Sequence, residues 1–221
     1  MTVSLIPAVV LAAMILFSGH QNATPNTTVS PVVQEATINL MEASPELAVN
    51  VEFEQPTSNS DLDYRTIHAF ILKQNKTIDP ADAAEISKSL VDSAQEQQID
   101  PKFVAAVIAR ESSFNKNAIS STGAKGLGQI KDFNFADLKI SDPFNIKENV
   151  YGTATYLKKQ LTNWKTTSTK TPLALASYFK GYGAVKRAGG WVDTKTNGYV
   201  TDIVNTYKHI LSMQKELAAT P

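Results

Sequence analysis

The stretch "ARESSFNKNAISSTGAKGLGQI", residues 109–130, joins an apolar run to a polar loop. The run "FVAAVIA" (103–109) leads directly into Arg110 and Glu111, and Ser, Asn and Gly dominate the residues that follow. A carboxylate at the end of a buried helix is costly unless it is paired. Glu111 is therefore either half of an ion pair, with Arg110 or a lysine, or an acid whose raised pKa lets it donate a proton near neutral pH.

The segments around this stretch predict a mainly α domain. Asp79 and Asp100 are each followed by proline, which is typical of an N-cap and the first residue of a helix. The second of these helices is apolar all round over 103–109, so we expect it to be central and buried. Apolar residues at three- and four-residue spacing predict further helices, and loops are expected between them at 115–145 and 181–198. The further helices are 146–164, a helix with Thr171 as cap, Pro172 first and Gly181 as its stop, and 199–217.

Composition and charge limit the function classes. The 221 residues are 43% hydrophobic, enough for one domain with a sizeable core. Residues 1–64 contain no Lys or Arg, so all 21 basic residues lie in 65–221 against 14 of the 21 acidic ones, and that part carries +7. This charge suits an anionic partner such as a cell-wall polymer, and it also fits an ordinary mixed surface. Lysine-rich pieces such as "YLKKQLTNWK" are typical of the solvated face of a helix, so we expect no nucleic-acid partner.

Metal and thiol chemistry find little support in the sequence. There is no cysteine, which excludes disulfides, thiol catalysis and Cys-ligated metals. The three histidines, His20, His68 and His209, are scattered and lack a metal-binding spacing. We therefore expect no metal and no cofactor.

The N-terminal residues predict export or anchoring. Residues 3–17 are uncharged and almost wholly apolar, shorter than the roughly 20 residues of a transmembrane helix and close to the core of a signal peptide. We predict a signal peptide or membrane anchor at 1–18, with a buried core helix as the alternative. Residues 19–62 are rich in Thr, Ser, Asn and Pro, which predicts a flexible polar linker with one short extended segment at "AVNVEFE" (48–54). The folded domain is then expected at 63–215.

Four motifs in the right order resemble one known family. "ESSFNKNAIS" (111–120) followed by "GAKGLGQI" (123–130) is similar to E-S-x-F-n-x-x-A-x-S and then G-A-x-G-L-M-Q-I. "ENVYGTATYLKKQL" (148–161) is similar to N-x-x-x-G-x-x-Y-L, "ALASYFKGYGAVKR" (174–187) to A-x-A-Y-N-A-G-x-G-x-V, and "GYV" (198–200) to a late tyrosine motif. These are the motifs of the lytic transglycosylases, which have the lysozyme-like SLT fold and are related to goose-type lysozyme. The resemblance covers about residues 80–210.

The resemblance implies a role for five residues. Glu111 would be the catalytic acid and base. Ser120 and Gln129 would be cleft residues that hydrogen-bond the sugar or the reacting centre, and simple loop polarity is the alternative for both. Tyr178 and Tyr199 would wall the site, one of them near the glutamate, whereas without the motifs both tyrosines would equally fit core packing.

The sequence departs from the family pattern at three positions. Gly128 stands where the family usually has Met, which removes a side chain from the cleft. Phe179 and Lys180 replace the common Asn-Ala after Tyr178, so an amide near the sugar is missing. We expect these departures to affect glycan preference or product fate.

Three functions are compatible with these observations. The first is a lytic transglycosylase that cleaves the β-1,4 bond between N-acetylmuramic acid and N-acetylglucosamine in peptidoglycan and forms 1,6-anhydro-N-acetylmuramic acid. The second is a goose-type lysozyme-like enzyme that hydrolyses the same bond. The third is a wall-binding or assembly component of a secretion system or virion with weak activity. The expected location is the periplasm or cell envelope, or a virion, with the membrane as a partner through the N-terminal segment.

A hydrolase would need a second carboxylate within roughly 5 to 10 Å of the acid. The candidates are Asp132, Asp137, Asp142 and Asp193, of which Asp132 follows the Gln129 loop most closely. Their surroundings are typical of turns and helix caps. We therefore expect a non-hydrolytic reaction.

Overall fold

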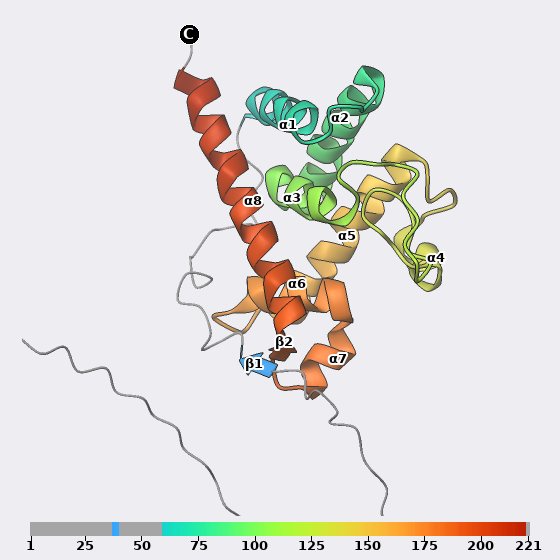
Figure 1. Ribbon diagram of the computed structural model, residues 1–221, viewed down its shortest axis with the longest axis vertical. Coiled ribbons are helices and arrows are strands. Elements are labelled where there is room, and N and C mark those ends of the chain that lie inside the picture. The colour runs from blue at the N-terminus through green and yellow to red at the C-terminus, as the bar shows by residue number, and fades with distance from the viewer. Residues whose placement is uncertain (1–36, 40–58, 220–221) are drawn as a thin grey trace, which may run out of the picture. The chain divides into compact units, whose positions relative to one another are not determined.

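The computed structural model describes residues 37–39 and 59–219 (Figure 1). The predicted leader at 1–18, most of the predicted linker and its extended segment at 48–54 lie outside the described residues. Among the residues described, no helix is both long and apolar enough to cross a membrane.

The described part of the chain is mainly α-helical, as predicted, with one short antiparallel strand pair. In chain order the elements are β1 (Thr37–Asn39), α1 (Ser60–Gln74), α2 (Pro80–Gln97), α3 (Pro101–Ser112), the 3-10 turn η2 (Asp132–Asn134), α4 (Phe135–Leu138), α5 (Ile146–Asn163), α6 (Lys170–Lys180), α7 (Tyr182–Arg187), β2 (Trp191–Asp193) and α8 (Thr194–Ala219).

The two predicted Asp-Pro helix starts are confirmed. The Asp79 carboxylate accepts the backbone N–H of Ala81 at 2.7 Å, and the Asp100 carboxylate accepts that of Lys102 at 2.8 Å. Each bond satisfies one of the N–H groups that the first turn of a helix leaves unpaired.

Two predicted boundaries are wrong. Helix α6 begins at Lys170 with Thr169 at the cap position, so Thr171 and Pro172 lie inside its first turn. The helix tolerates this shift because N–H groups in the first turn have no intrahelical partner, and proline loses nothing there. Helix α8 begins at Thr194 because the Asp193 carboxylate accepts the N–H of Thr196 at 2.7 Å and so caps it.

The two expected loops are only partly irregular. The segment 181–198 contains α7, β2 and the start of α8, and the segment 115–145 contains η2 and α4. Apart from α8, these elements are three to six residues long, and hydrophobic periodicity cannot be read over such short stretches.

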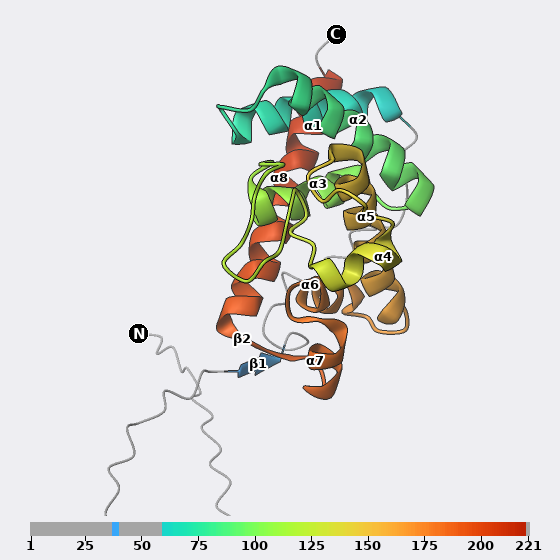
Figure 2. The same cartoon turned by 90° about the vertical axis from the view of Figure 1, so that its right-hand side faces the viewer.

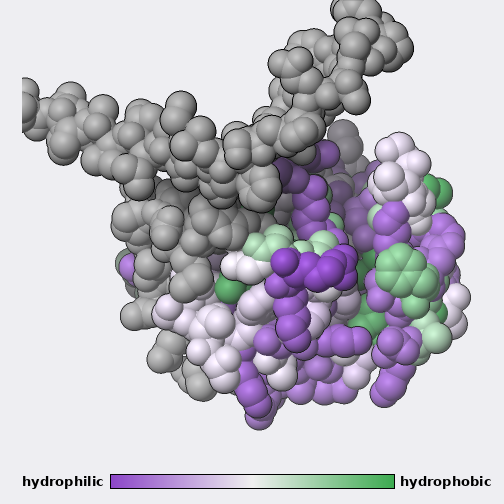
Figure 3. Space-filling model, turned by 90° about the horizontal axis from the view of Figure 1, so that it is seen from below, coloured by the Kyte–Doolittle hydropathy of each residue, from purple (hydrophilic) through white to green (hydrophobic). Residues whose placement is uncertain are grey.

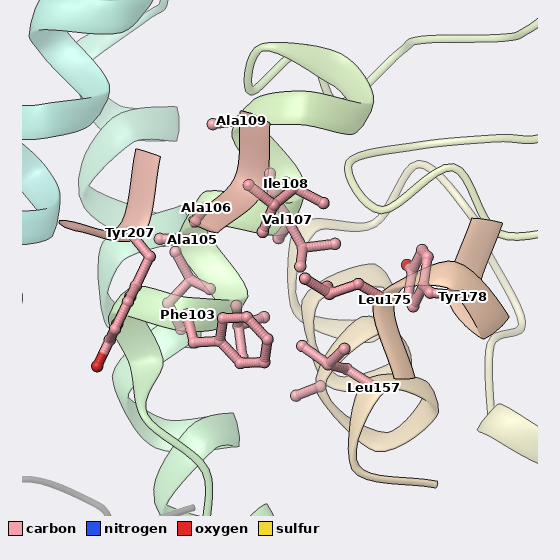
Figure 4. Close-up of a cluster of buried hydrophobic side chains, with 14 of the residues drawn as sticks. Phe103, Ala105, Ala106, Val107, Ile108, Ala109, Leu157, Leu175, Tyr178 and Tyr207 are labelled. Carbon is pink, nitrogen blue, oxygen red and sulfur yellow. The ribbon is translucent and has the colours of Figure 1, made fainter. Parts of the chain in front are cut away.

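Helix α3 lies in the core, as its uniformly apolar sequence predicts. Residues 103–108 are fully buried, and α3 packs against α1, α2, α5 and α8. Val107 and Ile108 lie toward Leu157 of α5 and Leu175 of α6, while Tyr207 of α8 lies on the other side of the helix (Figure 4). Figure 2 shows α8 passing alongside α3 and reaching α6 and β2 at its N-terminal end. This arrangement brings the C-terminal end of α3 next to α8 and the loop after α3.

A buried ionic cluster joins α1, α3 and α8. The Lys102 ammonium is fully buried and lies 2.7 Å from the Asp63 carboxylate and 3.0 Å from the Asp100 carboxylate. The Tyr207 hydroxyl donates to Asp100 at 2.7 Å, and the Gln214 amide donates to Asp63 at 2.7 Å. These contacts fix the N-terminal end of α3, and they make the first turn of α1, which starts at Ser60, part of the packed domain.

Three residues of the predicted linker form a strand. Thr37–Asn39 pairs antiparallel with Trp191–Asp193, with Thr37 opposite Asp193. This part of the predicted linker therefore contacts the helical domain directly.

Candidate active site

The loop after α3 begins with a tight reversal. Ser113 and Phe114 both have left-handed backbones, with φ of 50° and 62°, and the Phe114 side chain is buried edge-on against Phe70 of α1. A left-handed conformation is unfavourable for a bulky residue, so the packing of the ring must hold it in place. The reversal directs the following residues back across the end of α3.

Asn149 of α5 holds the glycine-rich part of this loop. Its side-chain carbonyl accepts the N–H of Gly128 at 2.8 Å, and its amide donates to the carbonyls of Pro143 and Lys125 at 2.8 and 3.2 Å. A Cβ at Gly126 would lie 2.2 Å from the Asn149 amide, and φ there is 74°. Glycine at this position is thus required by close approach as well as by backbone conformation.

The Gly128 departure is explained by α5. A Cβ at this position would lie 1.9 Å from the hydroxyl of Thr153. A side chain at position 128 would therefore collide with α5. Glycine is needed here because Thr153 occupies the space that a side chain would fill.

Glu111 occupies the last turn of α3 and is half-buried. Its carboxylate accepts the hydroxyl of Tyr199, from α8, at 2.6 Å. The neighbouring Arg110 guanidinium pairs with Asp202 at 3.2 Å and lies 5.5 Å from the centre of the Tyr199 ring. Of the two interpretations of Glu111, the arrangement favours the acid over half of an Arg110 ion pair.

The surroundings of Glu111 favour its protonated form. Burial raises the pKa of Glu111, and the Tyr199 hydrogen bond and the Arg110 charge offset this only in part. Burial and the charge of Glu111 also raise the pKa of Tyr199 well above its usual value, so this phenol remains a hydrogen-bond donor. A carboxyl group whose pKa is raised keeps its proton to higher pH, which is the property that a general acid needs.

Tyr178 lies close to the same carboxylate and supports the loop. Its hydroxyl donates to the carbonyl of Gly128 at 2.8 Å, and its ring packs edge-on against Tyr156 at 5.0 Å. Burial and the Glu111 charge raise the pKa of Tyr178 well above its usual value. Three of the five predicted site residues, Glu111, Tyr178 and Tyr199, are thus brought together.

Ser120 and Gln129 both make bonds within the loop. The Ser120 hydroxyl accepts the N–H of Ala124 at 2.9 Å, and the Gln129 amide donates to the carbonyls of Gly126 and Ala118 at 2.9 and 3.1 Å. These bonds shape the loop, and a sugar-binding role for the two side chains stays a prediction.

A pocket of about 210 Å³ lies between the loop and the end of α6. It contains two of the predicted site residues and two of the departures from the family pattern, and it is lined by Gln129, Ile130, Lys131, Phe133, Asn134, Tyr156, Tyr178, Phe179, Lys180 and Gly181. A larger hollow of about 860 Å³, lined by residues of α1, α2 and α5, contains none of the predicted site residues.

The four candidate second carboxylates each make a local contact. Asp132 pairs with Lys125 at 3.0 Å, and Asp137 lies 4.0 Å from Lys159. Asp142 accepts the N–H of Phe144 at 2.9 Å, and Asp193 caps α8 and pairs with Lys180 at 2.5 Å. The residues that the structure describes contain no group of three or more potential metal ligands.

Sequence reasoning assigned no role to Asn149, and it treated Phe179 only as a departure from the family pattern. Asn149 stands in the segment 148–161 that resembles the family, and this resemblance is the signal that could have found it. Phe179 stacks on Tyr199 with ring centres 4.6 Å apart, a contact that only the fold reveals.

Comparisons with known proteins agree on one family. The family model described as "Transglycosylase SLT domain" matches residues 89–199 of this chain. Membrane-bound lytic murein transglycosylase F of Desulfosudis oleivorans is 33% identical over 105 residues, which cover 46% of this chain and 23% of that protein. The transglycosylase of Enterobacteria phage PRD1 is 31% identical over 98 residues, covering 44% of this chain and 34% of the phage protein. The chain therefore matches only about a quarter to a third of the length of these relatives.

A solved structure has a similar fold. The lytic transglycosylase Slt of Pseudomonas aeruginosa superposes with a TM-score of 0.50 at 20% identity, over 72% of this chain and 30% of that one. At this identity the match supports the fold alone. Together with the family match over half of the sequence, it means that this chain belongs to the transglycosylase SLT domain family and has its lysozyme-like fold.

Proposed function

We propose that this protein is a peptidoglycan lytic transglycosylase that cleaves the β-1,4 bond between N-acetylmuramic acid and N-acetylglucosamine. The observation that carries the proposal is the half-buried Glu111 at the end of α3, with a raised pKa and a 2.6 Å hydrogen bond from Tyr199. Membership of the SLT family and the names of the relatives support the choice of substrate.

One carboxyl group suffices for this reaction. Protonated Glu111 gives its proton to the glycosidic oxygen as the bond to C1 of the muramoyl residue breaks. The resulting carboxylate then takes the proton of the C6 hydroxyl, whose oxygen attacks C1 and closes the 1,6-anhydro ring. Tyr199 stays protonated throughout and holds the Glu111 carboxylate in place.

The local contacts of the candidate second carboxylates favour this route over hydrolysis. Asp193, for example, accepts bonds from the N–H and hydroxyl of Thr196 and from Lys180, which commits it to capping α8. Without a committed second carboxylate, the C6 hydroxyl of the substrate is the nearest nucleophile to C1. Hydrolysis by a goose-type lysozyme-like mechanism and a weakly active wall-binding role remain the alternatives that an experiment must separate.

Products and a single substitution test the proposal. Mass spectrometry of digested sacculi is expected to show anhydro-muropeptides, one water lighter than the products of a lysozyme. Glu111→Gln keeps shape and hydrogen bonding but cannot transfer the proton, a role typically worth ~10²–10⁴-fold. The exposed Glu96→Gln serves as control and should retain full activity. More than a tenth of the wild-type rate in Glu111→Gln, or mainly reducing-end products, would contradict the assignment.

We further propose that the protein acts in the cell envelope, or on it from a virion. The apolar residues 3–17 would supply export or anchoring, and relatives include both membrane-bound enzymes and a phage protein. Fractionation of cells that express the full chain, compared with a chain lacking residues 1–18, tests the role of the leader.

A further inference from the structure

The pocket beside Tyr178 is positively charged. Two of its lining residues, Lys131 and Lys180, are cationic, and none of the others is acidic. Phe133, which is 81% exposed, and Phe179 add apolar walls. Figure 3 views the molecule from the side where α7 and β2 lie, and its described surface is largely hydrophilic with hydrophobic residues between. The pocket thus offers cations and apolar contact to the same ligand.

Lys180 is held in a fixed position. Its ammonium lies 2.5 Å from the Asp193 carboxylate, which Thr196 anchors in turn through two hydrogen bonds of 2.6 and 2.7 Å. Burial alone would raise the pKa of Asp193, but the bonds from Lys180 and Thr196 lower it to about 2. An ammonium has three donors, and the Lys180 side chain is 41% exposed, so donors remain for a ligand.

A second ammonium group, that of Lys195, lies near the same wall of the pocket as Lys180. The ammonium groups of Lys180 and Lys195 lie 5.7 and 5.8 Å from the centre of the Phe179 ring. Lys131, the other cationic lining residue, donates to the neutral carbonyl of Thr122, and the described residues include no acidic side chain paired with it. Positive charge therefore exceeds negative charge around the pocket, even though Lys180 is paired.

Two side-chain contacts link the wall of the pocket to the candidate acid. Phe179, in its wall, stacks on the Tyr199 ring at 4.6 Å, and the Tyr199 hydroxyl bonds Glu111. At about 210 Å³ it is smaller than the roughly 300–1,000 Å³ of pockets for drug-sized ligands. It is therefore sized for a small part of a ligand, such as one substituent of a glycan.

We propose that this pocket binds a carboxylate of the peptide attached to the muramic acid next to the cleaved bond, with Lys131 and Lys180 as its ligands. The inference rests on the proposed function. Of the two sugars of peptidoglycan, only N-acetylmuramic acid carries a peptide, and the peptide's carboxylates are the anionic groups nearest the glycosidic bond. Alanine methyl groups of the same peptide suit the Phe133 and Phe179 walls. The protein would therefore prefer peptide-bearing glycan over stripped glycan.

Two substrates and three variants test this preference. Initial cleavage rates (kcat/KM) of the full chain are measured on soluble glycan strands with their peptides and on the same strands after an amidase has removed the peptides. Lys180→Met and Lys131→Met should each lower kcat/KM on peptide-bearing strands roughly two- to five-fold, the effect of a partly exposed ion pair. Neither should alter it on stripped strands. Lys186→Met, whose ammonium lies over Tyr182 of α7 outside the pocket, removes the same charge and should keep the wild-type preference.

The measurements separate failure of this inference from failure of the proposed function. Because Lys180→Met also removes the cation paired with Asp193, Lys131→Met is the variant that separates ligand binding from local structure. Equal wild-type rates on the two substrates, or equal losses on both substrates in both variants, would overturn the inference while leaving the proposed function intact. Absence of cleavage of either substrate by the wild type would overturn the proposed function and this inference with it.

Discussion

Among the described residues, Tyr199 provides the hydroxyl that bonds Glu111, and replacing it with Phe removes that hydroxyl. The bond is 2.6 Å long and half-buried, and a hydrogen bond to a charged group is worth about 1.5–3 kcal/mol. If the bond positions the carboxyl group during proton transfer, kcat/KM on peptidoglycan should fall roughly 10- to 100-fold. The ring, its stacking on Phe179 and the fold should be retained, because only one oxygen atom is lost.

The same variant should change the pH dependence in a defined direction. The Tyr199 hydrogen bond lowers the pKa of Glu111 by stabilising the carboxylate, so its removal raises that pKa. Since the protonated form starts the reaction, the alkaline limb of the kcat/KM profile should move to higher pH. The measurement is kcat/KM for release of soluble fragments between pH 4 and 9.

Tyr207→Phe is the matched control. It removes a hydroxyl that donates to the Asp100 carboxylate at 2.7 Å, in the buried cluster at the other end of α3. This variant should be less stable to urea but keep the wild-type alkaline limb. An unchanged limb or a shift to lower pH in Tyr199→Phe would refute the reasoning about Glu111.

Three further predictions concern stability. Lys102→Met should lower the free energy of unfolding in urea by about 3–5 kcal/mol, because the buried carboxylates of Asp63 and Asp100 lose their cation, whereas Lys88→Met, in an exposed pair, should change it by less than about 1 kcal/mol. Gly128→Ala should cost about 1–3 kcal/mol by overpacking against Thr153, and Thr153→Ala in the same chain should restore part of this loss in Tm. A chain that begins at Asp61 should remain soluble and active on isolated peptidoglycan, but it lacks the Asn59 cap of α1 and should unfold about 1 kcal/mol more easily than one that begins at Asn59.

Local chemistry explains which features could be predicted from the sequence. The Asp79 and Asp100 caps act on residues two positions away, and the burial of 103–109 follows from a run with no polar face. The proximity of Tyr199 to Glu111 joins residues 88 positions apart, and only the family resemblance predicted it. Periodicity alone would place Tyr199 on the apolar face of α8, and the residue is indeed buried there. Periodicity does not, however, predict which group the Tyr199 hydroxyl bonds.

Features that depend on distant partners could not be predicted. Lys102, next to a helix cap, resembles any solvated lysine until Asp63 is brought to it from 39 positions away. Asp193 was expected in a loop, yet it caps α8 and fixes Lys180. In each case the sequence contains a charge, and its partner is determined by the packing of helices.

Two tyrosine–carboxylate bonds connect α3 to α8, and the difference between them explains why only one carboxylate is a candidate acid. Tyr207 bonds Asp100 before the first turn of α3 and Tyr199 bonds Glu111 in its last turn, so the two helices pass each other in opposite directions. At Asp100 a buried ammonium lies 3.0 Å away, and the carboxylate is half of an ion pair. At Glu111 the nearest cation along the chain, Arg110, is paired with Asp202, and the group lies at the helix terminus that carries partial negative charge. Burial and this dipole both oppose ionisation of Glu111, and the Tyr199 bond and the Arg110 charge offset them only in part. The pair of helices thus contains the same type of contact twice: one stabilises the fold, and the other holds the proposed proton donor at the edge of the loop.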